Sequence, residues 1–203
     1  MIRLSAIRKT IASYLTQPVV KLLARTPLAP DAITWLGFLI TVGATALIIS
    51  QHLFTAGLVV LIAGFFDILD GALARRTNRA TRFGSVLDST LDRLSEAALL
   101  LGLLVLYARE GLTVETLLAG LALPGSLMVS YIRAKAESLG MECQVGLFTR
   151  AERVVVLALG LLLSRINDGF LIIALAIIVV FSFITVGQRL FNVWQQTRKT
   201  GNS

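Results

Sequence analysis

Long apolar stretches alternate with short polar connections along almost the whole chain. A helix needs about 20 mostly apolar residues to cross a bilayer, and six stretches approach or exceed that length. They cover residues 32–50, 54–74, 85–108, 113–137, 152–165 and 169–190. The pattern predicts an all-α integral membrane protein with six transmembrane helices, of which the fifth is the shortest.

A narrower apolar stripe precedes the first of these stretches. It consists of Leu4, Ile7, Ile11 and Leu15. Steps of three and four residues place these side chains on one face of a helix. We therefore predict an N-terminal amphipathic helix within residues 1–25 that lies on the membrane surface and ends near Pro18. A cleaved signal peptide is the alternative, although the apolar stretch 32–50 starts late and is longer than a usual signal core.

The composition agrees with a single membrane domain over residues 1–203. Hydrophobic residues make up 56% of the chain and charged residues 15%, whereas soluble domains are about 45–50% apolar. Cys143 is the only cysteine, which excludes a disulfide framework within the chain. We expect residues 32–190 to form the helical bundle and residues 195–203 to form a disordered polar tail.

The basic residues lie almost entirely on one side of the predicted membrane. Only Arg109 and Arg165 fall in connections on the other side, which leaves 17 of the 19 Lys and Arg residues at the two termini and in two loops. The positive-inside rule therefore places both termini and these loops in the cytoplasm. The net charge of +7 fits anionic lipid head groups and phosphorylated substrates, and no nucleic-acid partner is expected.

Four aspartates interrupt the second and third apolar stretches. Asp67 and Asp70 are three residues apart, and Asp88 and Asp92 are four apart, so each pair shares one helix face. A carboxylate inside a membrane helix costs about 2.5–3.5 kcal/mol on insertion scales. A hairpin through residues 75–84 would bring both faces together, and their oxygens suit Mg²⁺, Mn²⁺ or Ca²⁺. The spacing predicts a divalent-metal site near the cytoplasmic boundary.

Simpler explanations exist for this region. The aspartates are exposed helix ends if they pair only with nearby basic residues. These residues are Arg75, Arg76, Arg79, Arg82 and Arg93. Small residues at Gly71, Ala74 and Gly84 leave room for a ligand and suggest a nucleotide beside the carboxylates. Small residues also serve ordinary packing between membrane helices.

Together these residues resemble a known family signature. The pattern D-x2-D-G-x2-A-R-x8-G-x3-D-x3-D is filled by Asp67, Asp70, Gly71, Ala74, Arg75, Gly84, Asp88 and Asp92. It resembles the signature of the CDP-alcohol phosphotransferases, or CDP-alcohol phosphatidyltransferases, and the six-helix prediction is similar to that family's fold. The resemblance implies a CDP-linked lipid as donor, CMP as leaving group and two divalent cations, Mg²⁺ or Mn²⁺. It also implies a homodimer in the cytoplasmic membrane of a prokaryote.

The resemblance further implies roles for individual residues. Asp67, Asp70 and Asp88 would hold the metals, and Asp92 would both approach a metal and act as general base. The implied contacts to CDP are Pro30, Asp31, Thr34, Gly71, Ala74, Arg75 and Thr81. Helix capping is an alternative role for Asp31 and Thr34.

A second resemblance concerns the acceptor alcohol. Residues 130–137 and the sequence R-A-E-R at 150–153 resemble the branch of the family that uses inositol phosphate. In that branch three basic positions form a phosphate pocket, and their matches here are Arg133, Arg153 and Arg189. Plain determination of membrane topology is the alternative explanation for these three residues.

We therefore predict an enzyme that transfers the phosphatidyl group of CDP-diacylglycerol to inositol phosphate, releasing CMP and forming phosphatidylinositol phosphate. The nearest alternative uses glycerol 3-phosphate as acceptor. A cation transporter is an alternative from a different class, because intramembrane aspartates also mark ion pathways. Asp70 lies only five residues before Arg75, which favours a site at the membrane interface over one at its middle.

Overall fold

The computed structural model describes residues 20–21, 29–77 and 79–200. The regular elements of this part with defined bounds are all helices. They are α2 (Pro30–Ile49), α3 (Leu53–Arg76), α4 (Arg82–Glu110), α5 (Thr113–Ser138), α6 (Arg150–Leu163) and α7 (Gly169–Thr200). Each coincides with one predicted apolar stretch, and the all-helical prediction is confirmed. Nearly all of the amphipathic helix predicted within residues 1–25 lies outside the described residues.

Four helices are long and apolar enough to cross a membrane, namely α2, α3, α5 and α7. Helix α6 has only 14 residues, which at about 1.5 Å per residue gives ~21 Å, less than the ~30 Å of the hydrocarbon core. Helix α4 has 29 residues, but several charged side chains interrupt its first half. These two helices account for the difference between the six predicted spans and the four apolar ones.

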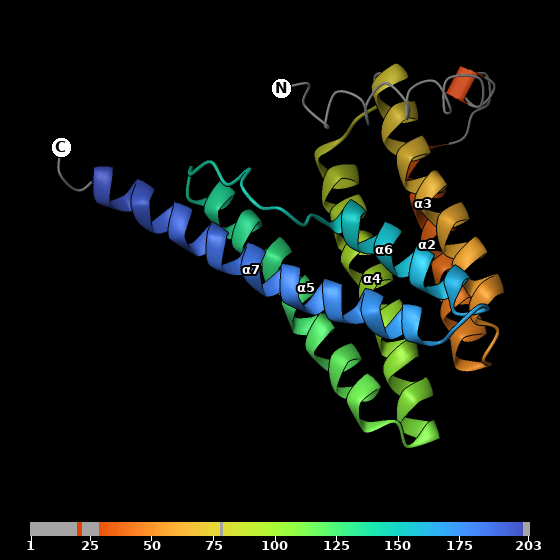
Figure 1. The fold of residues 1–203 in the computed structure, drawn as a ribbon. Coiled ribbons are helices and arrows are strands. Elements are labelled where there is room, and N and C mark those ends of the chain that lie inside the picture. Colours follow the sequence, from red (N-terminus) through yellow and green to blue (C-terminus); the bar gives the residue numbers. More distant parts are fainter. Residues whose placement is uncertain (1–19, 22–28, 78, 201–203) are drawn as a thin grey trace, which may run out of the picture.

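One apolar core connects all six helices. Helix α2 packs against α3 and α4, α5 packs against α4 and α7, and α6 lies against α3 and α7. Figure 1 shows α7 crossing the bundle and extending well beyond it. The core contains at least one nearly inaccessible side chain from every helix, including Ile48, Val60, Leu103, Ala122, Leu161 and Leu175. This core fixes the relative positions of the helices that carry the aspartates and arginines.

Polar residues define where α4 and α6 begin. Thr81 caps α4, because its Oγ1 accepts a hydrogen bond from the Gly84 amide at 2.8 Å. Thr149 and Glu152 form a capping box at the start of α6, in which the Thr149 amide donates to Glu152 Oε2 at 2.9 Å. The second cap makes Arg150 the first residue of α6.

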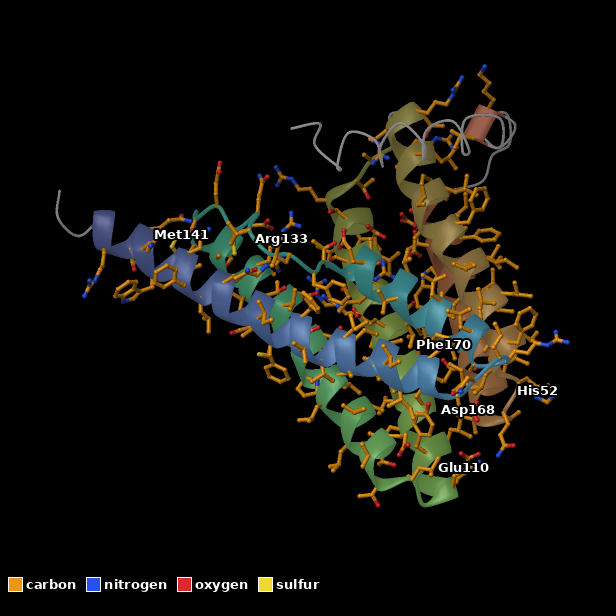
Figure 2. The ribbon with its side chains drawn as sticks, viewed as in Figure 1. His52, Glu110, Arg133, Met141, Asp168 and Phe170 are labelled. Atoms are coloured by element: carbon orange, nitrogen blue, oxygen red, sulfur yellow. The ribbon has the colours of Figure 1, made fainter. Side chains whose placement is uncertain are left out.

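The two ends of the bundle carry different connections. His52, Glu110 and Asp168 lie at one end, whereas Arg133 and Met141 lie at the other (Figure 2). The first end holds the short turns that join α2 to α3, α4 to α5 and α6 to α7. The second end holds the longer connection between α5 and α6. Successive helices therefore run in alternating directions, as the six-span prediction requires.

The polar tail differs from its prediction. Residues 195–203 were expected to be disordered, but α7 continues to Thr200. Gln196 Nε2 donates hydrogen bonds to Glu142 O at 2.7 Å and to Asn192 Oδ1 at 2.6 Å. These bonds tie the last turns of α7 to the connection between α5 and α6, which explains why the helix extends so far.

Candidate active site

The four aspartates occupy the facing ends of α3 and α4. Asp70 is the most buried of them, with 4% of its surface exposed. One of its oxygens, Oδ1, accepts a hydrogen bond from the Gly71 amide at 2.5 Å. The other, Oδ2, is buried and has no hydrogen-bond partner. A buried carboxylate oxygen without a partner is costly, and a cation would satisfy it.

Arg150 lies between two of these aspartates. Its Nη2 is 2.8 Å from Asp67 Oδ2, and its Nη1 is 2.5 Å from Asp92 Oδ1. One guanidinium therefore links a carboxylate of α3 to a carboxylate of α4. Sequence reasoning assigned no role to Arg150, although the capping box that begins with Thr149 was visible in the sequence and marks Arg150 as the first helical residue.

The carboxylate oxygens of the aspartate cluster suit divalent cations, but the side chains are not arranged around a single ion. Among the described residues, no three His, Cys, Asp or Glu side chains converge closely enough to surround one ion. The Arg150 guanidinium instead lies between Asp67 and Asp92. Four carboxylates, one of them with an unsatisfied buried oxygen, are nevertheless the donor set that hard cations prefer. Binding of a cation between Asp67 and Asp92 would require the guanidinium to move.

A cavity of about 170 Å³ lies between α2, α3 and the start of α4, and we call it the α2–α4 cavity. It is lined by all seven residues predicted to contact CDP, namely Pro30, Asp31, Thr34, Gly71, Ala74, Arg75 and Thr81. Asp70 and Asp88 also line it. The structure thus brings together residues that are up to 51 positions apart in the sequence, next to two of the four aspartates.

Helix capping does not explain Asp31 and Thr34. The N-cap of α2 is Ala29, and no side chain caps this helix. Thr34 Oγ1 instead donates to Pro30 O at 3.3 Å. A Cβ atom on Gly84 would lie 2.9 Å from Asp31 Oδ1, so the absence of a side chain at Gly84 allows α4 to begin beside Asp31.

A second cavity of about 590 Å³ lies between α4, α5, α6 and α7, and we call it the α4–α7 cavity. Asp88 and Asp92 line one side of it, and positive charge comes from Arg93, Arg133, Arg150 and Arg189. Asp88 lines both cavities. The two cavities therefore meet at the aspartates, and two ligands could approach each other there.

Arg189 is held rigidly at the wall of the α4–α7 cavity. Only 3% of its surface is exposed. Its Nε donates to Val145 O at 2.9 Å, and its Nη1 donates to Val129 O. Gly146 has φ 135°, and a Cβ there would lie 2.7 Å from a Thr185 methyl group, so glycine allows the connecting loop to approach α7. Neither bond uses Nη2 of Arg189, and the residue lines the α4–α7 cavity.

Arg133 and Arg153 differ sharply in their surroundings. Arg133 is half-exposed and pairs with Glu137 at 2.8 Å on the next turn of α5. Arg153 is 1% exposed, donates to Glu96 and to Phe148 O, and does not line the α4–α7 cavity. Arg150 thus lines the α4–α7 cavity together with Arg133 and Arg189, whereas Glu96 holds Arg153 inside the bundle, where its charge still acts on Arg189.

Comparison with known proteins decides the family. A family model described as CDP-alcohol phosphatidyltransferase matches residues 27–186. The chain belongs to the CDP-alcohol phosphatidyltransferase family. The resemblance inferred from the aspartate signature is confirmed, and membership identifies the chain as a transferase. The matched region covers α2 to α6 and more than half of α7, and it includes every residue that lines the two cavities except Arg189.

Two relatives of this CDP-alcohol phosphatidyltransferase have names that specify their product. Archaetidylinositol phosphate synthase of Methanothermobacter thermautotrophicus is 43% identical over 176 residues, which cover 86% of this chain and 87% of the relative. Phosphatidylinositol phosphate synthase of Mycobacterium tuberculosis is 36% identical over 206 residues, which cover 96% of this chain and 92% of the relative. Both relatives are named for an inositol phosphate product.

Solved structures of the Mycobacterium tuberculosis phosphatidylinositol phosphate synthase share this fold. One has CDP-DAG bound and gives a TM-score of 0.82 at 34% identity, covering 89% of this chain and 94% of that one. Another is a complex with manganese and citrate, with a TM-score of 0.82 at 35% identity and 88% of each chain covered. The CDP-alcohol phosphatidyltransferase fold is thus matched over nearly its full length.

Proposed function

We propose that this protein transfers the phosphatidyl group from a CDP-linked lipid to the hydroxyl of inositol phosphate, releasing CMP. The observation that carries the proposal is the meeting of two different cavities at Asp88. One cavity has the residues expected to bind CDP, and the other is lined by four arginines together with Asp92. The names of the relatives and the CDP-DAG-bound structure support this choice of donor and acceptor.

The donor occupies the α2–α4 cavity in this proposal. Pro30, Asp31, Thr34, Gly71, Ala74, Arg75 and Thr81 would contact CDP. Two divalent cations, Mg²⁺ or Mn²⁺, held by Asp67, Asp70, Asp88 and Asp92, would supply positive charge to the diphosphate oxygens. The manganese complex of the related structure supports this cofactor. Arg75 adds a permanent positive charge at the wall of the same cavity.

The reaction is a displacement at phosphorus. The acceptor hydroxyl oxygen forms a bond to the phosphorus that carries the lipid, and the bond between that phosphorus and the bridging diphosphate oxygen breaks. CMP leaves with the bridging oxygen. Asp92 lines the α4–α7 cavity and takes the proton of the attacking hydroxyl, because a neutral alcohol is a weak nucleophile. The product is a phosphodiester lipid.

Positive charge in the α4–α7 cavity favours a phosphorylated acceptor. Arg189 is fixed by backbone oxygens of another helix and a loop, and Arg133 faces the same space. Arg150 would turn from Asp67 and Asp92 toward the acceptor when cations bind those carboxylates. Guanidinium groups bind phosphate oxygens through charge-assisted hydrogen bonds. An acceptor without a phosphate, such as serine or free inositol, would offer these guanidinium groups less negative charge. We assign the acceptor phosphate to the predicted Arg133, Arg153 and Arg189, and to Arg150 at the wall of the same cavity.

The direct test is release of CMP by purified protein supplied with Mg²⁺ or Mn²⁺ and a CDP-lipid donor. Ester-linked and ether-linked donors are compared, each with inositol phosphate, glycerol 3-phosphate, free inositol and serine. We expect inositol phosphate to give the highest kcat/KM. Preference for glycerol 3-phosphate would overturn the acceptor assignment, and no CMP release with any acceptor would overturn the proposed reaction.

Membrane topology forms part of the proposal. We propose that all six helices are spans, with both termini and the active site on the cytoplasmic side, supported by the charge distribution and the alternating helix directions. Cys143 is fully buried, so it should react little with a thiol reagent. The labelling of single cysteines introduced elsewhere can therefore be measured with little background. Cysteines near residues 111 and 167 should be labelled by an impermeant maleimide from outside intact cells, whereas one near residue 79 should not. The proposed homodimer is tested by the mass of the purified protein in detergent.

Removal of the Glu137 charge should improve binding of the acceptor. Its carboxylate pairs with Arg133 and lines the same cavity, so it competes with an acceptor phosphate for that arginine. Glu137→Gln should lower the acceptor KM by about twofold to fivefold, which is the scale of an exposed ion pair. The KM of the CDP-lipid should not change. A raised acceptor KM would show that Glu137 binds the acceptor instead of opposing it.

A further inference from the structure

Helix α7 is longer than one bilayer crossing requires. It has 32 residues, from Gly169 to Thr200, and it begins directly after the polar residues Asn167 and Asp168. The hydrocarbon core is ~30 Å thick, and a helix rises about 1.5 Å per residue. A helix that enters the core at Gly169 therefore leaves it between about residue 189 and about residue 195, for tilts of about 0–40° from the bilayer normal. The last turns of α7, which extend beyond the other helices in Figure 1, lie past that boundary.

One face of α7 is exposed over most of its length. Residues 173, 177, 180, 184, 187, 191, 194 and 198 follow one another at steps of three and four, which places them on the same side of the helix. Large hydrophobic side chains on this face are between 44% and 57% exposed, namely Ile173, Val180, Ile184, Phe191 and Trp194. The surroundings of the protein therefore contact this face directly.

The chemistry of this face changes along the helix. The face is aliphatic as far as Ile184, whereas Phe191 and Trp194 are aromatic. Their rings stack with centroids 5.7 Å apart, and the Arg198 guanidinium lies 4.2 Å from the centre of the Trp194 ring. Aliphatic residues in the core, aromatic residues at its edge and cations near the lipid phosphates are the order found across a membrane. The order along α7 matches that profile, and the aromatic pair falls in the interval where the helix leaves the core.

The polar side of these turns faces the protein. Gln188 Oε1 accepts a hydrogen bond from the Leu147 amide at 3.3 Å, and Gln196 Nε2 donates to Glu142 O at 2.7 Å. Both bonds hold the end of α7 against the connection between α5 and α6. A helix end in water has the opposite arrangement, with apolar residues turned inward and polar ones outward. The outward aromatic residues of α7 therefore indicate an environment other than bulk water.

A second copy of the chain is a less suitable occupant of this face than lipid. Helices that pair within membranes usually meet through small residues, but only Gly187 is small among the eight positions of the face. A contact with protein also gives no reason for the change from aliphatic to aromatic to cationic side chains where the helix leaves the core. Lipid accounts for both observations.

We propose that Phe191, Trp194 and Arg198 form an interfacial anchor that binds the phospholipids of the cytoplasmic leaflet. The two rings lie at the edge of the hydrocarbon core, and Arg198 pairs with lipid phosphate. The same turns are bonded to the connection between α5 and α6, and Arg189 lies less than one turn before Phe191. The anchor therefore holds this wall of the α4–α7 cavity at the level of the head groups. This inference rests on the proposed topology of α7, and it goes beyond the proposed reaction.

The depth of Trp194 in the bilayer tests the anchor. The chain has two tryptophans, so Trp35→Phe leaves Trp194 as the only one and retains an aromatic ring beside Phe38. The full-length variant is reconstituted into vesicles of phosphatidylcholine and phosphatidylglycerol. Its fluorescence is quenched by lipids with a nitroxide near the head group, by lipids with a nitroxide near the chain end, or by acrylamide in the water. We expect the shallow nitroxide to quench most, and the two lipid labels together to place Trp194 about 15 Å from the bilayer centre, half the ~30 Å core.

Two results would overturn the anchor. Quenching mainly by acrylamide would place Trp194 in water. Protection from all three quenchers would show that protein covers the face, and recovery of quenching when the protein is diluted in lipid would identify that protein as a second copy.

Ile184→Trp provides the matched control on the same face. It is made in a Trp35→Phe/Trp194→Phe background, ten residues before position 194 and therefore ~15 Å nearer the start of α7 along the helix. We expect the deep nitroxide to quench this tryptophan most. If both positions give the same shallow depth, α7 lies along the membrane surface, and both the anchor and the proposed topology of α7 are wrong. If position 184 is deep while Trp194 is reached mainly by acrylamide, the topology stands and only the anchor fails. CMP release by the same variants reports separately on the proposed reaction.

Discussion

Asp92→Asn should reduce kcat by about a hundredfold to ten-thousandfold, the usual contribution of general acid–base catalysis. The amide cannot accept the proton of the acceptor hydroxyl, but it has nearly the shape of the carboxylate. It also retains one oxygen that can accept a hydrogen bond from Arg150, the partner of Asp92 in the structure. The KM of the CDP-lipid should change little, because Asp92 lines the α4–α7 cavity and not the α2–α4 cavity.

A matched control for this variant is available at the other end of the bundle. Asp168 lies at the same end of the bundle as Glu110 and His52, away from Arg133 (Figure 2). Asp168→Asn removes the same charge there and should leave CMP release unchanged. Full turnover by Asp92→Asn would refute the role of general base. If Asp92→Asn only weakened Mn²⁺ binding, and kcat recovered at saturating metal, Asp92 would be a metal ligand and not the general base.

Local spacing was sufficient to predict the aspartates and the helices. Asp67, Asp70, Asp88 and Asp92 stand out because carboxylates are costly in apolar helices, and their three- and four-residue steps are visible without any tertiary information. The apolar stretches predicted most helix bounds to within a few residues, because hydrophobicity is also visible without tertiary information. The last turns of α7 escaped prediction, because they depend on the contact between Gln196 and a backbone oxygen of another segment.

The roles of the arginines could not be predicted from the spacing of residues along the sequence. Arg150 and Arg153 are three residues apart, and either could face a phosphate when only the sequence is known. The partner that separates them is Glu96, 57 positions before Arg153. Which carboxylate of α4 meets which arginine of α6 depends on how two distant helices pack. The capping box at Thr149 fixes where α6 starts, but it does not fix the face that α6 turns toward α4.

Arg189→Gln should raise the acceptor KM by about tenfold to a hundredfold, the range expected for loss of a hydrogen bond to a charged group. The KM of the CDP-lipid should stay constant, because α7 does not reach the α2–α4 cavity. Arg189→Lys should recover only part of the loss. A lysine keeps the charge, but it cannot bind the two backbone oxygens and a phosphate with the same planar geometry.

The neighbouring residue provides the control that separates charge from anchoring of the loop. Gln188 Oε1 accepts a hydrogen bond from the Leu147 amide at 3.3 Å, so Gln188→Ala also removes a contact between α7 and the loop before α6. It removes no positive charge from the cavity. If Gln188→Ala raised the acceptor KM as much as Arg189→Gln, the arginine would serve to hold the loop. If only Arg189→Gln has the large effect, and the effect is smaller for a neutral acceptor than for inositol phosphate, then the guanidinium binds the acceptor phosphate.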